Sequence, residues 1–169
     1  GLRYPRQETV TEFTGERVIP GQVDVDLLNE HLARYAFAAR LARGKRVLDA
    51  GCGVGYGAAR LAAHARSVVG LDLAPEAIDL ARRDYSRPNL AFLRSDCRDF
   101  PFPDGAFDLV VAFEVIEHLP DWSRLLGEAR RVLASWGALV VSTPNRLYYG
   151  QQRDVPNPFH VHEFDYAEF

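Results

Sequence analysis

The sequence predicts a doubly wound α/β domain built around a mostly parallel sheet. Short apolar runs of strand length alternate with longer segments of helical periodicity, which is the pattern of consecutive βαβ units. A cluster of glycines directly follows the first apolar run, and single acidic residues follow the next two. The 169 residues, of which 47% are hydrophobic, are enough for one such domain.

The first part of the chain supplies two strands and three helices. The pattern predicts an amphipathic helix over 26–42, preceded by an irregular stretch. The first strand is Arg46–Ala50, and a short alanine-rich helix over 58–65 follows the glycines. Ser67–Asp72 is the second strand. The next helix covers 75–85 and opens on a proline, which suits the first position of a helix.

The second part supplies three further strands and one helix. Leu90–Leu93 reads as a third strand, and Phe107–Phe113 as a fourth that is apolar on both faces, as expected of a central parallel strand. Apolar side chains at helical spacing predict a helix over 122–133, and Gly137–Ser142 is the fifth strand. The polar, aromatic and proline-rich stretch 143–164 reads as a long loop.

Composition excludes several classes of protein. The net charge of −3 argues against non-specific binding to nucleic acid or to an anionic membrane surface. No apolar run approaches the roughly 18 residues that a transmembrane helix needs. Cys52 and Cys97 are too few for a disulfide scaffold or a zinc cage, so we expect a protein of the reducing cytoplasm.

The glycine loop is the sharpest local signal. Four glycines follow Asp49 at alternate positions, and such a loop lets a ligand approach the backbone and directs N–H groups toward it. The run Gly53–Ala58 also satisfies a dinucleotide fingerprint, so an NAD(P)-dependent oxidoreductase is one alternative. A carboxylate at Asp49 would repel a pyrophosphate but attract a cationic amine or sulfonium.

From about Lys45 to Asn145 the chain resembles the class I S-adenosylmethionine-dependent methyltransferases, of the type 11 subgroup. The resemblance implies a Rossmann-like fold with S-adenosylmethionine as cofactor and S-adenosylhomocysteine as product. In this family the acid after the second strand, here Asp72, binds the ribose, and the acid after the third, here Asp96, binds the adenine amino group. Asp72 would suit NAD equally well. The residues assigned to the cofactor are Asp49, Gly51, Cys52, Gly53, Gly55, Asp72, Leu73, Asp96, Cys97, Phe113 and Glu114.

The segment 113–120 is also a hallmark of that family and implies an acceptor site beyond the fourth strand. His118 is the candidate general base if the acceptor is a hydroxyl, although it could instead only cap or pack the turn. We expect a small-molecule or glycan acceptor, methylated on oxygen. A non-catalytic cofactor-binding domain is a further alternative.

No metal ligand is assigned from the sequence. A divalent metal site is nevertheless an alternative. It starts from Glu114, Glu117 and His118, whose spacing would put them on one face of a helical turn. A similar pattern with a later histidine, here His162, occurs in metal-dependent 2′-O-methyltransferases of small RNAs. That likeness implies a divalent ion held by these four residues.

We expect two regions, a lid segment and helix over 1–44 and the cofactor-binding domain over 45–169. The resemblance implies Arg17, His31, Arg34 or Tyr35 as lid residues that could reach the cofactor. The family's sheet has seven strands, whereas five are recognisable here. We therefore expect the last helix and two strands to be missing from this sequence, which would leave the fifth strand as an open edge. Residues 165–169 read as the start of that helix, and we expect the native chain to continue beyond them.

Overall fold

The structure is a computed structural model that describes residues 18–22, 25–149 and 157–169. Its elements alternate along the chain as the sequence pattern predicts. The strands are β1 (Arg46–Ala50), β2 (Ser67–Asp72), β3 (Leu90–Arg94), β4 (Phe107–Phe113) and β5 (Leu133–Ser142). The helices are α1 (Val25–Ala42), α2 (Tyr56–Ala62), α3 (Pro75–Asp84), α4 (Trp122–Val132) and α5 (Arg146–Tyr149), with a 3-10 turn, η1, at Ile116–His118.

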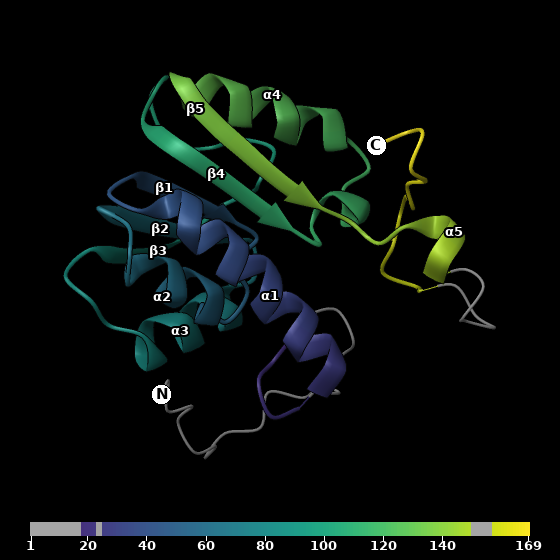
Figure 1. Ribbon diagram of the computed structural model, residues 1–169, viewed down its shortest axis with the longest axis horizontal. Helices are drawn as coiled ribbons and strands as arrows, with labels where there is room; N and C mark the ends of the chain where they lie inside the picture. Colours follow the sequence, from purple (N-terminus) through teal and green to yellow (C-terminus); the bar gives the residue numbers. More distant parts are fainter. Residues whose placement is uncertain (1–17, 23–24, 150–156) are drawn as a thin grey trace.

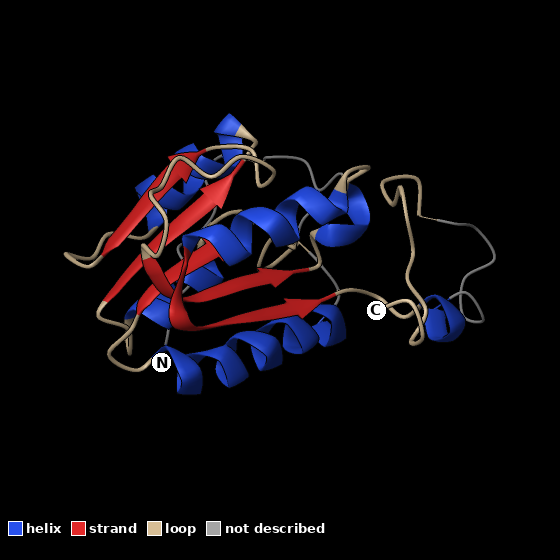
Figure 2. Cartoon of the chain, turned by 90° about the horizontal axis from the view of Figure 1, so that it is seen from above, coloured by secondary structure: helices blue, strands red, loops and turns tan. Residues whose placement is uncertain are grey.

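The strands form one parallel sheet in the order β3-β2-β1-β4-β5. Helices cover both faces of it, with α1, α2 and α3 on one side and α4 on the other (Figures 1 and 2). The chain order reverses between β1 and β4, and ligands of open parallel sheets bind at the carboxyl ends of the strands at such a switch point. This confirms the predicted doubly wound α/β class.

Alternate residues of the central strands belong to two separate cores. Val47 of β1 and Val111 of β4 pack under α1, α2 and α3, whereas Leu48 and Val110 pack under α4. All four side chains are fully buried. The prediction that β4 is apolar on both faces is therefore confirmed, and its physical reason is the pair of helical layers.

Helix α1 is part of the first core and not a separate layer. Tyr35, Ala38 and Ala42 are buried against α2 and the sheet. The division of the chain at residue 44 stays a prediction, and most of the expected lid, including Arg17, lies outside the described residues. In the part that the structure describes, no helix is both long and apolar enough to cross a membrane.

Apart from shifts of one residue at element ends, four segments differ from their expected bounds. Helix α2 begins at Tyr56 and ends at Ala62, where a helix over 58–65 was expected. Strand β5 begins at Leu133, directly after α4, because Leu133 pairs with Phe107 before a register shift in β4. The stretch expected to be a loop contains the short helix α5, whose residue Arg146 donates its backbone N–H to the carbonyl of Phe164. Residues 165–169 form a turn instead of opening a helix, with Asp165 accepting backbone N–H groups of the turn itself.

Candidate active site

A cavity of about 540 Å³ lies at the carboxyl ends of the strands. It is lined by backbone and side chains from the glycine loop, the ends of β2, β3 and β4, helix α1, and the segment after residue 157. Most residues that the sequence assigned to the site line it: Gly51, Cys52, Gly53, Asp72, Leu73, Asp96, Cys97, Phe113, Glu114 and His118. Asp49 and Gly55 are not among the lining residues.

The backbone N–H groups of the glycine loop already have partners within the protein. Gly51 and Cys52 both donate to the carbonyl of Leu71, at N···O distances of 2.8 and 2.7 Å. Gly53 donates to Asp72 Oδ2 at 2.9 Å, and Gly55 donates to the carbonyl of Cys52. For these four amides the expectation of free N–H groups directed at a ligand is therefore wrong. The end of β2 accepts those of Gly51, Cys52 and Gly53, and the loop itself accepts that of Gly55.

Glycine is nevertheless required in this loop for close packing. Gly51 has φ of +78°, and a Cβ there would lie 2.3 Å from Val115 Cγ2. Gly55 has φ of +87°, and a Cβ there would lie 2.7 Å from Ala81 and 2.8 Å from Phe92. Gly55 therefore lets α2 sit close to α3 and β3. Phe92 itself is 7% exposed and belongs to the core.

Asp49 is buried at the end of β1 beneath the cavity. Its two carboxylate oxygens both accept from the hydroxyl of Tyr35, at 3.1 and 3.2 Å. Burial raises the pKa of Asp49 to about 7, against the lowering effect of the Tyr35 hydrogen bond. Tyr35 itself lines the cavity. In this structure the Asp49 carboxylate accepts the hydrogen bond of the Tyr35 hydroxyl. Direct contact of Asp49 with a cofactor stays a prediction.

Asp72 and Leu73 line the cavity at the carboxyl end of β2. Each oxygen of Asp72 accepts one backbone N–H, from Gly53 at 2.9 Å and from Ala74 at 3.0 Å, which fixes the carboxylate and leaves each oxygen able to accept again. Leu73 is 58% exposed beside it. An exposed apolar side chain next to a fixed carboxylate suits a ligand with a flat apolar ring and adjacent hydroxyls.

Asp96 is held by a partner that sequence reasoning missed. It accepts from the backbone N–H of Arg98 at 2.8 Å and from the Arg98 guanidinium at 2.7 to 3.2 Å. The Arg98 side-chain hydrogen bonds hold the pKa of Asp96 below its usual value. The signal available in the sequence was an arginine two positions after the acid.

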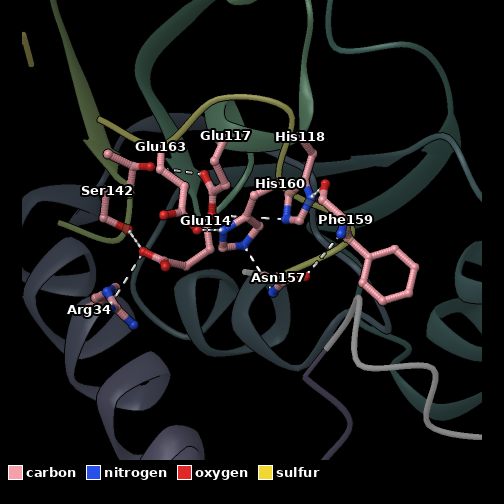
Figure 3. A network of polar contacts seen from close by, with 10 residues as sticks. Arg34, Glu114, Glu117, His118, Ser142, Asn157, Phe159, His160 and Glu163 are labelled. Atoms are coloured by element: carbon pink, nitrogen blue, oxygen red, sulfur yellow. Dashed lines mark hydrogen bonds and ion pairs between the residues drawn. The ribbon is translucent and has the colours of Figure 1, made fainter. Parts of the chain in front are cut away.

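Glu114 stands apart from the turn that follows it. Its φ of +56° is left-handed, and the 3-10 turn η1 begins only at Ile116. The spacing predicted that Glu114 shares one helical face with Glu117 and His118. This prediction is wrong, because Glu114 lies before the turn. Its carboxylate accepts from the Ser142 hydroxyl at 2.7 Å and lies 3.5 Å from the Arg34 guanidinium (Figure 3). Arg34 Nη1 is buried with no hydrogen-bond partner among the described residues.

A second polar group combines η1 with the segment after residue 157. Oxygen and nitrogen ligand atoms of Glu117, His118 and His160 lie within 4.8 Å of one another (Figure 3). Glu117 is 1% exposed, and burial, followed by the charge of Glu114, raises its pKa to about 8. The structure places His160 in this group, in the position where the sequence alternative had His162. The imidazole of His162 instead packs on Phe164, with ring centroids 4.4 Å apart.

Helix α1 contributes the remaining polar wall. His31 lines the cavity, its Nδ1 lies 3.1 Å from the Tyr56 hydroxyl, and burial lowers its pKa to about 4. Of the expected lid residues, His31, Arg34 and Tyr35 thus reach the cavity. The sequence indicated them only through the family resemblance of this segment, and their spacing of three and four residues puts them on one face of α1.

A family model described as a methyltransferase domain matches residues 48–141, more than half of the chain. The chain belongs to this family. The matched span runs from β1 to β5 and includes the glycine loop, Asp72, Asp96 and the η1 turn, so the family assignment made from the sequence motifs is confirmed.

Individual relatives agree with this membership. A probable S-adenosylmethionine-dependent methyltransferase of Mycolicibacterium smegmatis is 41% identical over 92% of this chain and 61% of its own length. A fatty-acid O-methyltransferase of the same organism is 42% identical over 67% of this chain and 40% of its own. The solved YcgJ protein of Bacillus subtilis shares the fold, with a TM-score of 0.72 at 23% identity over 82% of this chain and 64% of that one. The chain thus spans less than two thirds of these relatives' lengths.

Proposed function

We propose that this chain is the catalytic domain of an S-adenosylmethionine-dependent methyltransferase that methylates an oxygen atom of a small molecule or glycan. The observation that carries the proposal is that one cavity brings together two groups of residues. The glycine loop, Asp72, Leu73 and Asp96 line it after β1, β2 and β3, which we call the cofactor end. Glu117 and His118 line it after β4, which we call the acceptor end. Such a cavity has room for a cofactor and an acceptor side by side.

The cofactor end fits S-adenosylmethionine in its charges and its shape. Asp72, fixed by two backbone N–H groups, is set to accept from ribose hydroxyls, and exposed Leu73 is set to lie against the adenine ring. Asp96 and the backbone of Cys97 would take the adenine edge. The cavity-facing guanidinium of Arg34, with an unpartnered nitrogen, would receive the carboxylate of the methionine moiety.

When bound, S-adenosylmethionine supplies an electrophilic methyl group on a sulfonium. Transfer to an acceptor hydroxyl forms a carbon–oxygen bond, breaks the carbon–sulfur bond with its electron pair left on sulfur, and releases the hydroxyl proton. The protein contributes alignment, which can supply effective molarities of about 10⁵ M or more. His118 is the candidate acceptor of the proton.

The apolar part of the cavity lining favours an acceptor with an apolar portion next to its hydroxyl. Val18, Leu27, Leu119 and Pro144 contribute apolar surface to the same cavity. The similarity to a fatty-acid O-methyltransferase points in the same direction. Among small molecules and glycans, we therefore place hydroxylated or carboxylated lipid-like acceptors first.

A binding competition tests the cofactor assignment against its main rival. We expect calorimetric titration to show micromolar binding of S-adenosylhomocysteine and no comparable binding of NAD or NADP. Preferential binding of a nicotinamide dinucleotide would instead favour the oxidoreductase alternative. A screen of lipid-like alcohols, fatty acids and glycans, read out by release of S-adenosylhomocysteine, then tests the acceptor class and separates an enzyme from a non-catalytic binding domain.

A further inference from the structure

We propose that Glu117, His118 and His160 form a binding site for a divalent metal ion of the manganese-to-zinc series at the acceptor end of the cavity. The inference rests on the proposed function only for the role of the ion, and the site itself is argued from the side chains. Their ligand atoms lie within 4.8 Å of one another, and all three residues line the cavity.

The first observation is a buried carboxylate oxygen, Oε1 of Glu117. Glu117 is 1% exposed. Its Oε2 accepts from the Thr143 hydroxyl at 3.1 Å, whereas its Oε1 has no hydrogen-bond partner among the described residues. Leaving a buried acceptor without a partner costs about 1–3 kcal/mol. A cation at this point would remove that cost.

The second observation is the way His118 is oriented. Its Nδ1 lies 2.8 Å from the carbonyl oxygen of Phe159, which can only accept, so Nδ1 carries the hydrogen (Figure 3). The other ring nitrogen, Nε2, is therefore the one able to coordinate in the neutral imidazole, and it lies 3.9 Å from Glu117 Oε1. A backbone carbonyl that fixes the tautomer in this way is typical of metal-bound histidines.

His160 is oriented in the same manner by a carboxylate. Its Nδ1 lies 2.7 Å from Glu163 Oε1, and its Nε2 lies 3.2 Å from the Asn157 amide nitrogen. The Asn157 oxygen accepts the backbone N–H of Phe159, so the amide nitrogen is the group that faces the imidazole as donor. Nε2 of His160 is thus an acceptor. In many metal proteins a histidine binds the ion through one ring nitrogen and donates the N–H of the other to a carboxylate.

The two segments that carry these residues are fixed to each other by backbone contacts. The carbonyl of Glu117 accepts the N–H groups of Val161 and His162, at 2.8 and 3.1 Å. Ligand atoms about 2.1 Å from an ion lie roughly 3 to 3.5 Å apart, so ligand atoms that now lie within 4.8 Å of one another need to close by about 1.8 Å at most. Small rotations suffice, with Asn157 moving off His160.

The donor set defines the ion and what it would do. Two imidazoles and one carboxylate suit borderline ions such as Mn²⁺, Co²⁺ or Zn²⁺ better than Mg²⁺ or Ca²⁺, which prefer oxygen ligands throughout. Three protein ligands leave open positions for an acceptor hydroxyl. Coordination lowers the pKa of that hydroxyl, so its proton passes to solvent when the carbon–oxygen bond forms and the carbon–sulfur bond breaks. His118 then acts as a ligand in place of a base.

The site is tested by binding of a metal ion to the chelator-treated chain. Titration with Co²⁺ should give a visible absorption band of 1:1 stoichiometry, and calorimetry with Zn²⁺ should give a matching affinity. We expect Glu117→Gln and His160→Gln to weaken Zn²⁺ binding at least about tenfold, and Glu163→Gln to weaken it by a smaller factor. His64→Gln, at an exposed position remote from the cavity, should bind as the parent does.

His162→Gln provides the sharpest control, because His162 lies two residues from His160 but packs on Phe164. Retained Zn²⁺ affinity in this variant supports the site, whereas loss in His162→Gln with retention in His160→Gln overturns it. Absence of stoichiometric binding in the parent also overturns it. These readouts need no methyl transfer, so bound metal without any activity would count against the proposed function alone, and full activity with chelator against the ion's role.

Discussion

Asp72 connects the glycine loop, α3 and the cavity through a single carboxylate. It accepts backbone N–H groups of Gly53 and Ala74 and has lone pairs left for a ligand. We expect Asp72→Ala to weaken S-adenosylhomocysteine binding about 10- to 100-fold, because hydrogen bonds to a charged group contribute about 1.5–3 kcal/mol each. Calorimetric titration measures the change. Asp79→Ala, on the exposed side of α3, is the control and should bind normally, and unchanged affinity in Asp72→Ala would contradict the ribose assignment.

Asp49 makes the stability of the fold depend on pH. Its folded-state pKa is raised from 3.8 to about 7, mainly by burial, so the folded state holds a proton that the unfolded state has released between these values. The stability contributed by the neutral acid is thus present below about pH 4 and is lost as pH rises to about 7.

The isosteric variant Asp49→Asn removes this titration and keeps an acceptor for the Tyr35 hydroxyl. We expect the free energy of unfolding of the variant minus that of the parent to increase by about 3 kcal/mol from pH 5 to pH 8. Urea denaturation at both pH values measures the difference. An unchanged difference between parent and variant across that range would show that Asp49 titrates normally in the folded chain.

At the scale of elements, the packing of α1 on α2 depends on one glycine. A Cβ on Gly57 would lie 2.0 Å from the Tyr35 ring. The Tyr35 ring also packs edge-on against Phe113, with centroids 5.0 Å apart, so it has little room to retreat. The contact between the two helices therefore fixes the tyrosine that holds Asp49.

Two glycine-to-alanine substitutions in helices should have opposite effects. Gly57→Ala should destabilise the fold by about 2 kcal/mol, because it overpacks the buried contact with Tyr35. Gly127→Ala in α4 meets nothing within 4 Å and should stabilise it by about 1 kcal/mol through helix propensity. Thermal and urea unfolding of both variants measures this. Equal effects would mean that α1 does not pack on α2 as described.

At the scale of the whole molecule, Phe164 anchors the segment 157–169 to the rest of the fold. It is 2% exposed and packs on Trp122 at the start of α4, with ring centroids 5.4 Å apart. Its carbonyl also accepts the backbone N–H of Arg146. Because His160 lies in this segment, the acceptor end of the cavity depends on an anchor that does not itself line the cavity.

Phe164→Ala should therefore release this segment without unfolding the sheet. We expect hydrogen exchange in 157–169 to rise about tenfold or more, since truncating a buried Phe costs about 3–5 kcal/mol, while β1 and β4 stay protected. Hydrogen-exchange mass spectrometry resolves the two regions. Tyr166→Ala, at a residue that is 89% exposed, is the matched control and should change neither. Equal loss of protection in β4 would show that the segment belongs to the main core.

The fold and the gathering of the glycine loop, Asp72 and Asp96 around one cavity were predictable because their signals are local in the chain. Strands β1, β2 and β4 have the predicted bounds, since short apolar runs between breakers leave little freedom. Asp72, Asp96 and the loop glycines follow strands that all point toward the same edge, and the family motif spans this region. The amides of Gly51 and Gly53 do not follow the prediction, because their acceptors, the carbonyl of Leu71 and the carboxylate of Asp72, come from the neighbouring strand.

The acceptor end was decided by tertiary structure. The sequence by itself determined that Glu117 and His118 follow β4 and that histidines recur near the end of the chain. Whether His160 or His162 faces Glu117 depends on how segment 157–169 docks, which is set by the Phe164 anchor and by two N–H groups donated to the carbonyl of Glu117. Those contacts join residues more than forty positions apart, and no local pattern in the chain specifies them.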